Sequence, residues 1–436
     1  MQKLITGSLL LCGMLLSGLN GQAAVPLAAE KAIEAIEPQM IQWRRDLHQQ
    51  PELSNREFKT SKKIAAHLHA IGLDKVETGI GHTGVVGTLI GGKPGPVIAL
   101  RADMDALPVA EQTGLAFASQ AKGEYRGQEV SVMHACGHDA HVAMLMAAAQ
   151  VLAENRAELA GTLKFIFQPA EEGPPSGEEG GAALMIKEGV LSGADAPEAI
   201  LGLHVWPDDA GRLIYRAGGF MAAADTLEIT VNGRQTHGSS PWLGVDPIYT
   251  AAQIAIALQG IPSRHLDITQ GPVVITIGSF NGGIRGNIIP DTVEMAGTIR
   301  TFDRAVREQL HQKLRQTVAA IAKANGATVK VSITAAAPVT VNDPVLLRQM
   351  MPSLEWAAAQ HGVHEGRAIT GAEDFGYFEQ KIPGLFLHLG VGNTDIARSE
   401  RPANHSPLFD VQESALIIGV RALVGFAFDY RGKTAS

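Results

Sequence analysis

Hydrophobic residues in the first 215 positions occur in short runs that predict strands alternating with helices. Apolar runs at 85–90, 96–100, 162–167 and 199–203 have the length of buried strands. The segment 139–153 is rich in alanine, methionine and leucine on all sides, which is typical of a buried helix. This alternation predicts an α/β fold in which a mostly parallel sheet is flanked by helices.

Helix starts near the two ends of the chain are predicted from capping residues. Pro38 is expected to open a helix within the helical region 30–72, because proline suits a first helical position. Ser54 and Glu57 have the spacing of a capping box for a second helix. Asp410, with Glu413 three residues later, predicts the start of the last helix.

A different order of elements occupies residues 216–332. The pattern predicts a strand at 227–231, a helix at 247–259, strands at 273–279 and 292–300, a helix from about 303, and a strand at 328–334. The order β-α-β-β-α-β is that of a ferredoxin-like domain. It predicts an inserted α+β domain between two parts of a catalytic domain, residues 24–215 and 333–436.

The first 23 residues have the pattern of a secretory signal peptide. Lys3 precedes an apolar centre, and residues 21–23 offer small residues for cleavage. A membrane anchor is the competing interpretation, but the apolar centre is short and interrupted by glycine. A lipoprotein signal ending at Cys12 would need small residues before the cysteine, where leucines stand. We therefore expect an exported protein, periplasmic or secreted, with no membrane segment after signal removal.

Composition narrows the class of protein and of partner. The 436 residues are too many for one simple core, and a hydrophobic content of 45% is ordinary for a globular protein. The formal charge of -8 gives no basic surface for nucleic acid or an anionic membrane. A small-molecule substrate is the expected partner.

Cys136 is the only cysteine outside the signal segment, and it lies among three histidines and an aspartate at 134–141. A lone thiol in an exported protein is an inert buried residue, a nucleophile or a metal ligand. The Cys-Gly-His sequence can present Cys136 and His138 to one metal ion from a single loop. All three interpretations remain open on this motif alone.

Polar residues directly follow three of the predicted strands, where ligands bind in open α/β sheets. Asp103 and Asp105 follow the first, Glu171 and Glu172 the second, and His204 the third. Carboxylates oppose ionisation of a nucleophilic thiol and suit a metal site. One glutamate can bind metal while the other accepts a proton, provided that the backbone turns at residues 169–170.

Seven ordered motifs resemble the co-catalytic metallopeptidases related to aminoacylase and glutamate carboxypeptidase. Within them the chain is most similar to the amidohydrolases that include hippurate hydrolase and indole-acetyl-amino-acid hydrolase. The motifs lie at residues 44–53, 101–108, 134–141, 168–173, 202–204, 371–375 and 404–407. They cover essentially the whole chain after the signal, and as an ordered set they are highly specific.

The resemblance implies a role for each matching residue. Two divalent metal ions, zinc or manganese with cobalt or nickel as alternatives, would be held by Cys136, His138, Glu172, His204 and His405. Glu171 would be the general base, and Asp105 would orient a ligand histidine.

In the inserted domain, His237 would polarise the substrate carbonyl or stabilise the oxyanion, and Asn287 would help to hold the substrate carboxylate. That domain would act as a lid and form a homodimer, and in some relatives the lid histidine acts from a neighbouring subunit. His48 and the other histidines without companions are expected to be structural or exposed.

The resemblance implies hydrolysis of the amide bond of N-acyl amino acids, of the hippurate or acetyl-amino-acid kind. A dipeptidase or carboxypeptidase using the same two-metal site is the alternative. A non-catalytic binding protein would lack a ligand or the base, and every one of these residues is present. A cysteine hydrolase would survive chelation, which is a simple test.

Overall fold

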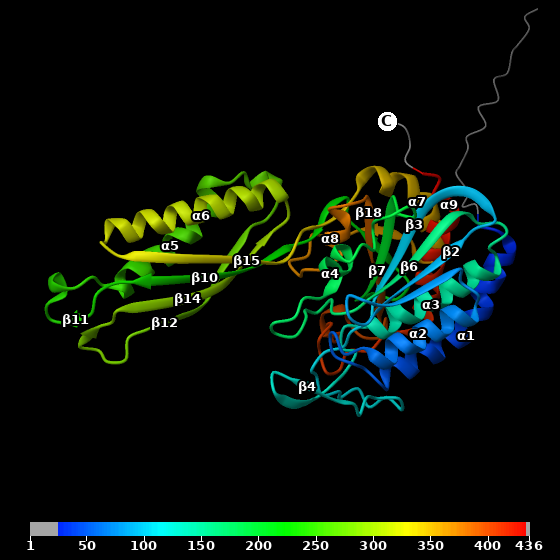
Figure 1. Ribbon diagram of the computed structural model, residues 1–436, viewed down its shortest axis with the longest axis horizontal. Helices are drawn as coiled ribbons and strands as arrows, with labels where there is room; N and C mark the ends of the chain where they lie inside the picture. The colour runs from blue at the N-terminus through cyan, green and yellow to red at the C-terminus, as the bar shows by residue number, and fades with distance from the viewer. Residues whose placement is uncertain (1–24, 433–436) are drawn as a thin grey trace, which may run out of the picture.

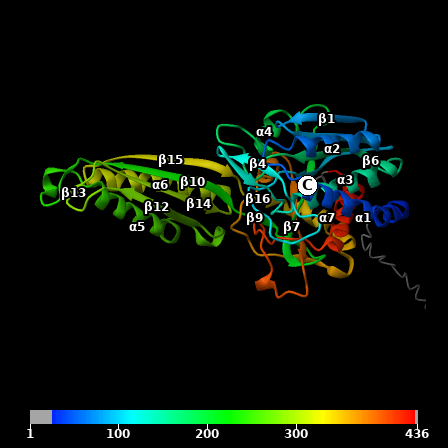
Figure 2. The same cartoon turned by 90° about the horizontal axis from the view of Figure 1, so that it is seen from below.

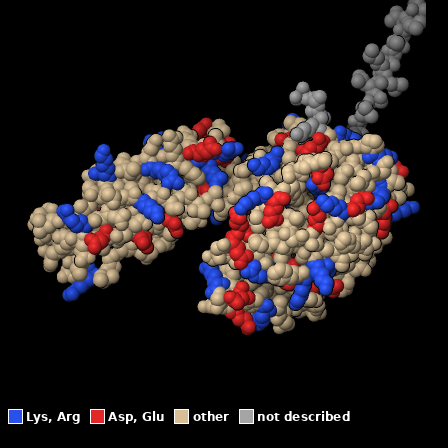
Figure 3. Space-filling view, viewed as in Figure 1, with Lys and Arg blue, Asp and Glu red and all other residues tan. Residues whose placement is uncertain are grey.

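The computed structural model describes residues 25–432 and shows an elongated molecule of two domains (Figures 1 and 2). The predicted signal peptide at residues 1–23 lies outside the described residues. Within them, no helix has the length and apolar character needed to cross a membrane. Acidic and basic side chains are interspersed on the face in Figure 3 rather than gathered by sign.

The larger domain, called the catalytic domain after its expected role, is built on an eight-stranded sheet. Across the sheet the strands are β1 (Lys75–Ile80), β2 (Gly84–Ile90), β6 (Ala160–Gln168), β3 (Lys93–Asp103), β7 (Ala199–Asp209), β18 (Gly384–Gly392), β8 (Leu213–Tyr215) and β17 (Val363–Glu365). The adjacent strands β6, β3, β7 and β18 run parallel, so their carboxyl ends meet at one edge. The predicted mostly parallel sheet is confirmed.

Helices cover both faces of this sheet. One face packs against α1 (Leu27–His48), α2 (Phe58–Ala70), α3 (His138–Glu154), α7 (Pro344–Ala358) and α9 (Leu416–Asp429). The other packs against α4 (Gly181–Lys187) and α8 (Gly376–Glu379). Helix α3 lies against both α1 and α9 and is almost wholly buried, which explains why its sequence is apolar all round. It begins directly after the cysteine–histidine loop and so anchors that loop in the core.

The lid domain has the predicted β-α-β-β-α-β order. Its elements are β10 (Ala223–Asn232), α5 (Pro247–His265), β12 (Val274–Gly282), β14 (Thr292–Thr301), α6 (Arg304–Ala324) and β15 (Thr328–Ala337). The antiparallel sheet has the order β12-β14-β10-β15, and α5 and α6 share its hydrophobic core. The inserted α+β domain expected from the sequence is therefore present.

Smaller strand pairs complete the structure. Strands β4 (Lys122–Tyr125) and β5 (Gln128–Ser131) form a hairpin, and β9 (Gly218–Met221) pairs with β16 (Thr340–Asn342) where the chain passes between the domains. A two-residue ribbon, β11 (Thr236–His237) with β13 (Ile288–Ile289), lies at the end of the lid domain far from the catalytic domain (Figures 1 and 2).

The prediction that Pro38 opens a helix is wrong, because α1 begins at Leu27 and runs through Pro38. The buried positions Ile33, Ile36 and Met40 keep helical spacing across the proline. Pro38 is exposed, so the carbonyl that its missing N–H leaves free can reach water. Burial of one continuous apolar face outweighs the local cost of the proline.

Two predicted caps are also wrong, because their side chains bind elsewhere. Ser54 donates to Asp105 at 2.7 Å, and α2 starts at Phe58 without a side-chain cap. Asp410 accepts from Arg44 at 3.2 Å, and α9 starts only at Leu416. In both places a tertiary contact near the catalytic site replaces the local cap.

Candidate metal centre and active site

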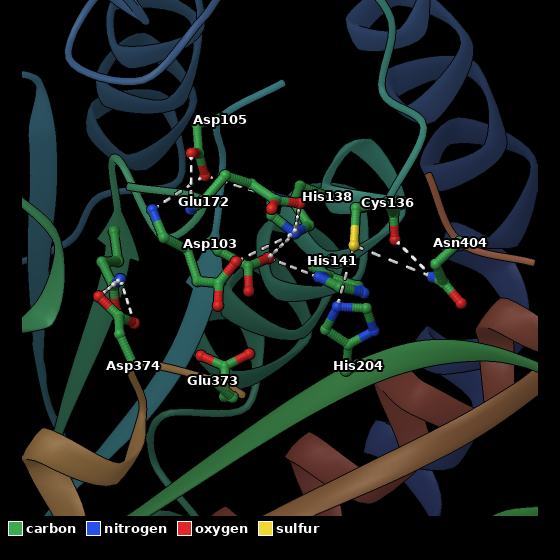
Figure 4. A network of polar contacts seen from close by, with 12 residues as sticks. Asp103, Asp105, Cys136, His138, His141, Glu172, His204, Glu373, Asp374 and Asn404 are labelled. Atoms are coloured by element: carbon green, nitrogen blue, oxygen red, sulfur yellow. Dashed lines mark hydrogen bonds and ion pairs between the residues drawn. The ribbon is translucent and has the colours of Figure 1, made fainter. Parts of the chain in front are cut away.

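The carboxyl ends of β3, β6 and β7, the loop before α3 and the loop at 404–405 converge on one cluster of side chains (Figure 4). All five predicted ligands lie in it. The possible ligand atoms of Cys136, His138 and His204 lie within 4.8 Å of one another, as do those of Cys136, Glu172 and His405. Cys136 belongs to both groups, so the cluster has room for two ions, each next to Cys136.

Gly137 shapes the loop that carries Cys136 and His138. Its φ is +90°, a left-handed conformation that favours glycine. A Cβ at this position would stand 2.3 Å from a methyl carbon of Val205. The glycine therefore lets the loop pack against β7 and turn both potential ligands toward the cluster.

The two adjacent glutamates reach the same site because the backbone turns before them, as the sequence analysis required. Ala170 has a φ of +53°. After this turn the backbone N–H groups of Glu171 and Glu172 both donate to Asp105, at 3.2 and 3.1 Å. Asp105 thus fixes the strand end that carries both carboxylates.

Hydrogen bonds set the tautomers of two potential ligand histidines. His204 Nδ1 lies 2.8 Å from the carbonyl oxygen of Val205, which can only accept, so Nδ1 carries the proton and Nε2 has a free lone pair. That Nε2 lies 3.4 Å from the sulfur of Cys136. His138 Nδ1 lies 3.2 Å from Asp105, which leaves its Nε2 to face the cluster. A carboxylate or carbonyl behind each ring is the usual arrangement of a metal-ligating histidine.

The fit to metal rests on one buried atom. His138 Nε2 has no hydrogen-bond partner in the described part of the chain, although carboxylate oxygens of Asp103, Glu171 and Glu172 lie 3.8 to 4.0 Å away. A buried imidazole nitrogen without a partner is costly. A cation among these groups would satisfy the nitrogen and the carboxylates together, so the residues fit a metal ion.

The pKa values of Cys136 and Glu171 also support a metal site. Burial raises the pKa of Cys136 well above its ordinary value, and the carboxylates of Glu172 and Glu171 raise it further. Burial also raises the pKa of Glu171, helped by the negative charges of Glu373 and Glu172. Without a cation the thiolate is strongly disfavoured, which counts against Cys136 as a free nucleophile. Divalent cations would supply the compensating charge.

The sequence analysis assigned no role to Asp103, which lies in the centre of the cluster. It accepts from Arg101 and lies 2.5 Å from His141 Nδ1. His141 Nε2 in turn accepts the N–H of Val205 at 2.8 Å, so both of its ring nitrogens are engaged. His141 therefore supports β7 rather than serving as a ligand. The motif at 101–108 could have pointed to Asp103, but not to this pairing.

Arg101 connects Asp103 to a segment far along the chain. It is fully buried and binds Glu373 at 2.9 Å and Asp374 at 3.2 Å. These two acids and Glu171 form a further carboxylate group within 4.8 Å. Because Arg101 and Glu373 are 272 positions apart, no local pattern could have predicted this contact.

Helix α1 holds the loop of Cys136 and His138 in place through Asp139, the residue after His138. Arg44 Nε and His48 Nδ1 lie 2.9 and 2.8 Å from the same Asp139 oxygen. Burial alone would lower the pKa of His48, but the Asp139 carboxylate outweighs it and raises the pKa to about 9. The predicted structural role of His48 is thus part of the support of the site.

Replacement of Arg44 by alanine is expected to destabilise the protein by about 3–5 kcal/mol, because the Asp139 carboxylate would remain buried without its main partner. Arg45→Ala is the matched control. Arg45 is 45% exposed and forms its ion pair with Glu413 at the surface, so its loss should cost about 1 kcal/mol or less. Urea unfolding measures both, and equal losses would contradict the proposed anchoring role.

The structure does not bring His237 and Asn287 to the cluster of the same chain. His237 lies on the ribbon at the far end of the lid domain and Asn287 directly precedes its second strand, where Gly238 N donates to Asn287 O at 2.9 Å (Figures 1 and 2). His237 Nδ1 accepts the backbone N–H of Ser239 at 3.1 Å. In the neutral ring this leaves Nε2 as the hydrogen-bond donor.

Comparison with known proteins identifies the family. The model of peptidase family M20/M25/M40 matches residues 99–429. The chain belongs to this family. The resemblance inferred from the ordered motifs, and the expected enzyme class of a metallohydrolase, are therefore confirmed.

Relatives of this chain within the family are named for different activities. Thermostable carboxypeptidase 2 of Saccharolobus solfataricus is 41% identical over 92% of this chain and 98% of its own. N-acetyl-L-cysteine deacetylase of Bacillus subtilis is 39% identical over 88% of this chain and 86% of its own. A crystal structure from Bacillus subtilis, described as a dinuclear metal-binding peptidase of the M20 family, is 35% identical. It has a TM-score of 0.74 and covers 91% of this chain and 98% of its own.

Proposed function

We propose that this M20 enzyme hydrolyses the amide bond of N-acyl amino acids to a carboxylic acid and a free amino acid. The observation that carries the proposal is the unpartnered Nε2 of His138, buried among three carboxylates beside Cys136 and His204. Two divalent ions would be held by Cys136, His138, Glu172, His204 and His405. When bound, they would activate a water and polarise the amide carbonyl.

Glu171 is the residue we propose to move the proton. It stands beside the ligand Glu172, and its carboxylate lies 3.9 Å from His138 Nε2. It would accept a proton from the attacking water and return it to the departing amine. His237, with its Nε2 as donor, would stabilise the negative charge that develops on the carbonyl oxygen.

Zinc is the metal that the ligand set favours, because it combines a thiolate with imidazoles. Manganese, cobalt and nickel are the alternatives, since three carboxylates, those of Asp103, Glu171 and Glu172, stand in the same cluster. Metal analysis of the protein as purified, followed by reconstitution of the stripped protein with each ion, would rank them.

A cavity beside Glu172 supports an acylated substrate. It has a volume of about 620 Å³ and apolar walls that include Leu53, Leu107, Tyr125 and Pro174. Its two arginines, Arg56 and Arg126, are balanced by two glutamates, Glu124 and Glu172, so the lining has no net negative charge to attract the free α-ammonium group of a dipeptide. An uncharged acyl group suits this cavity better.

The alternative function is that of a dipeptidase or carboxypeptidase. The similarity to a thermostable carboxypeptidase supports this alternative. The deciding experiment compares hippurate, acetyl-amino acids and dipeptides, with and without a chelator and with metal restored. We expect turnover of the first two, lost on chelation and regained with metal. Faster hydrolysis of dipeptides would favour the alternative, and activity that survives chelation would contradict both.

Cys136→Ser is expected to reduce metal occupancy first and activity as a consequence, since the thiolate is shared by both possible ligand groups. Metal content by mass spectrometry should fall below that of the unmodified protein, and excess metal should restore part of the activity. If the variant kept full metal content but lost all activity, Cys136 would be a reacting group instead.

We further propose a homodimer formed through the lid domain and export to the periplasm or medium. The dimer is supported by the distance of His237 from its own site, which a second subunit could overcome (Figure 1). Light scattering at micromolar concentration should give twice the chain mass, and a monomer would contradict it. Export is supported by the pattern of residues 1–23, and N-terminal sequencing of secreted material tests it.

A further inference from the structure

A second cavity adjoins the metal centre at its His204 side. It has a volume of about 520 Å³ and lies between the end of β7 and the segment 364–369. Trp206, two residues beyond His204 on the same strand face, forms one wall, and Phe220 and Ile369 add apolar surface. His388 of β18, paired in register with His204, also lines it, and the two rings lie 6.0 Å apart.

His388 is a polar group that the fold does not use. It is fully buried, yet neither ring nitrogen has a hydrogen-bond partner among residues 25–432. Its ring stacks on Trp206 at 4.4 Å and contacts Phe220 at 4.6 Å, so it is held in one orientation. Leaving such a group unsatisfied is costly, and a ligand atom in the cavity would remove that cost.

The cavity is also cationic. Three arginines line it against two carboxylates, Asp208 and Glu365, which leaves one positive charge in excess. Arg212 and Arg398 already pair with Asp208. Arg367 is exposed and has no ion pair in the described chain, so its guanidinium is available for a bidentate contact with a carboxylate.

We propose that this cavity binds the amino-acid half of the substrate, with its carboxylate on Arg367 and a polar atom on His388. The inference rests on the proposed hydrolysis of N-acyl amino acids. One cavity is lined by Glu172, and the other by Trp206 and His388, whose rings each lie 6.0 Å from that of His204. A linear amide lying over the metals would therefore extend one half toward each cavity. The cavity beside Glu172, whose charged side chains balance, suits the uncharged acyl group, and the cationic cavity suits the half that carries the negative charge.

The test compares Arg367→Gln and His388→Phe in the full-length metal-loaded enzyme. His388→Phe keeps an aromatic ring against Trp206 while removing both nitrogens. For an acetyl-amino acid, each variant should raise KM about tenfold to a hundredfold with kcat changed little, as expected for a lost charge-assisted or buried hydrogen bond. For the corresponding amino-acid amide, which lacks the carboxylate, Arg367→Gln should leave KM unchanged. Arg348→Gln, an exposed arginine on α7 outside this cavity, is the control.

An unchanged KM in Arg367→Gln, or an equal rise for the amide substrate, would overturn the inference even if His388→Phe failed to fold. Calorimetric titration of an acetyl-amino acid onto the Glu171→Gln protein separates this inference from the proposed function. If the unmodified enzyme hydrolysed no N-acyl amino acid, weaker binding on adding Arg367→Gln to Glu171→Gln would still support the cavity assignment. Equal binding by the two proteins would overturn it.

Discussion

Glu171→Gln is expected to lower kcat by about 10²–10⁴-fold while the metal content stays that of the unmodified enzyme. Glu171 lies within 4.8 Å of His138 and Glu172, but it belongs to neither of the two groups that contain Cys136, and those two groups include all five proposed ligands. Its loss should therefore remove proton transfer and leave the ligands in place. Steady-state kinetics and metal analysis on the same preparation measure both quantities.

The neighbouring residue gives the matched control. Glu172→Gln also removes one glutamate carboxylate that follows the same turn. Unlike Glu171, Glu172 contacts His405, at 3.1 Å. It should lose metal, and part of its activity should return in excess metal, whereas Glu171→Gln should not respond. Metal loss in Glu171→Gln, or near-normal turnover, would contradict the assignment of Glu171 as the base.

Much of this cluster could be predicted because several of the proposed ligands follow strand ends in a parallel sheet. Strand alternation places the ends of β3, β6 and β7 at one edge, so Asp105 and His204 meet there, and Glu172 joins them after the turn at Ala170. The ordered motifs then supply the roles. The loop before α3 adds Cys136 and His138 because α3 must begin at that same edge.

What could not be predicted depends on contacts between distant segments. Arg101 binds Glu373, which lies 272 positions away in the sequence. The sequence around His388 predicts only a buried strand and gives no sign of a special role for this residue. The failed caps have the same origin. Ser54 and Asp410 carry good local capping signals, but Asp105 and Arg44 compete for them in the folded protein. Where polar side chains converge in the folded protein, tertiary contacts override local capping preferences.

A mixture of two inactive variants is expected to regain activity if the lid histidine serves a neighbouring subunit. His237→Ala alone should lower kcat about 10²–10³-fold, because it removes a donor to the developing oxyanion. The ribbon that carries His237 lies at the far end of its own lid, and Ser239 fixes Nε2 as the donor (Figure 2). In a symmetric dimer, a mixed pair with Glu171→Gln contains one site with both residues intact.

Random pairing would place about a quarter of all sites in that intact form, so co-expressed His237→Ala and Glu171→Gln chains should reach about a quarter of the unmodified activity. Ser239→Ala is the subtler control. It removes the hydroxyl 2.7 Å from His237 Nδ1 but keeps the backbone N–H, so the donor tautomer and most activity should survive. If the mixture showed only the summed activity of the two variants, His237 would have to reach its own site by closure of the lid. A dimer confirmed by light scattering would then have no catalytic role.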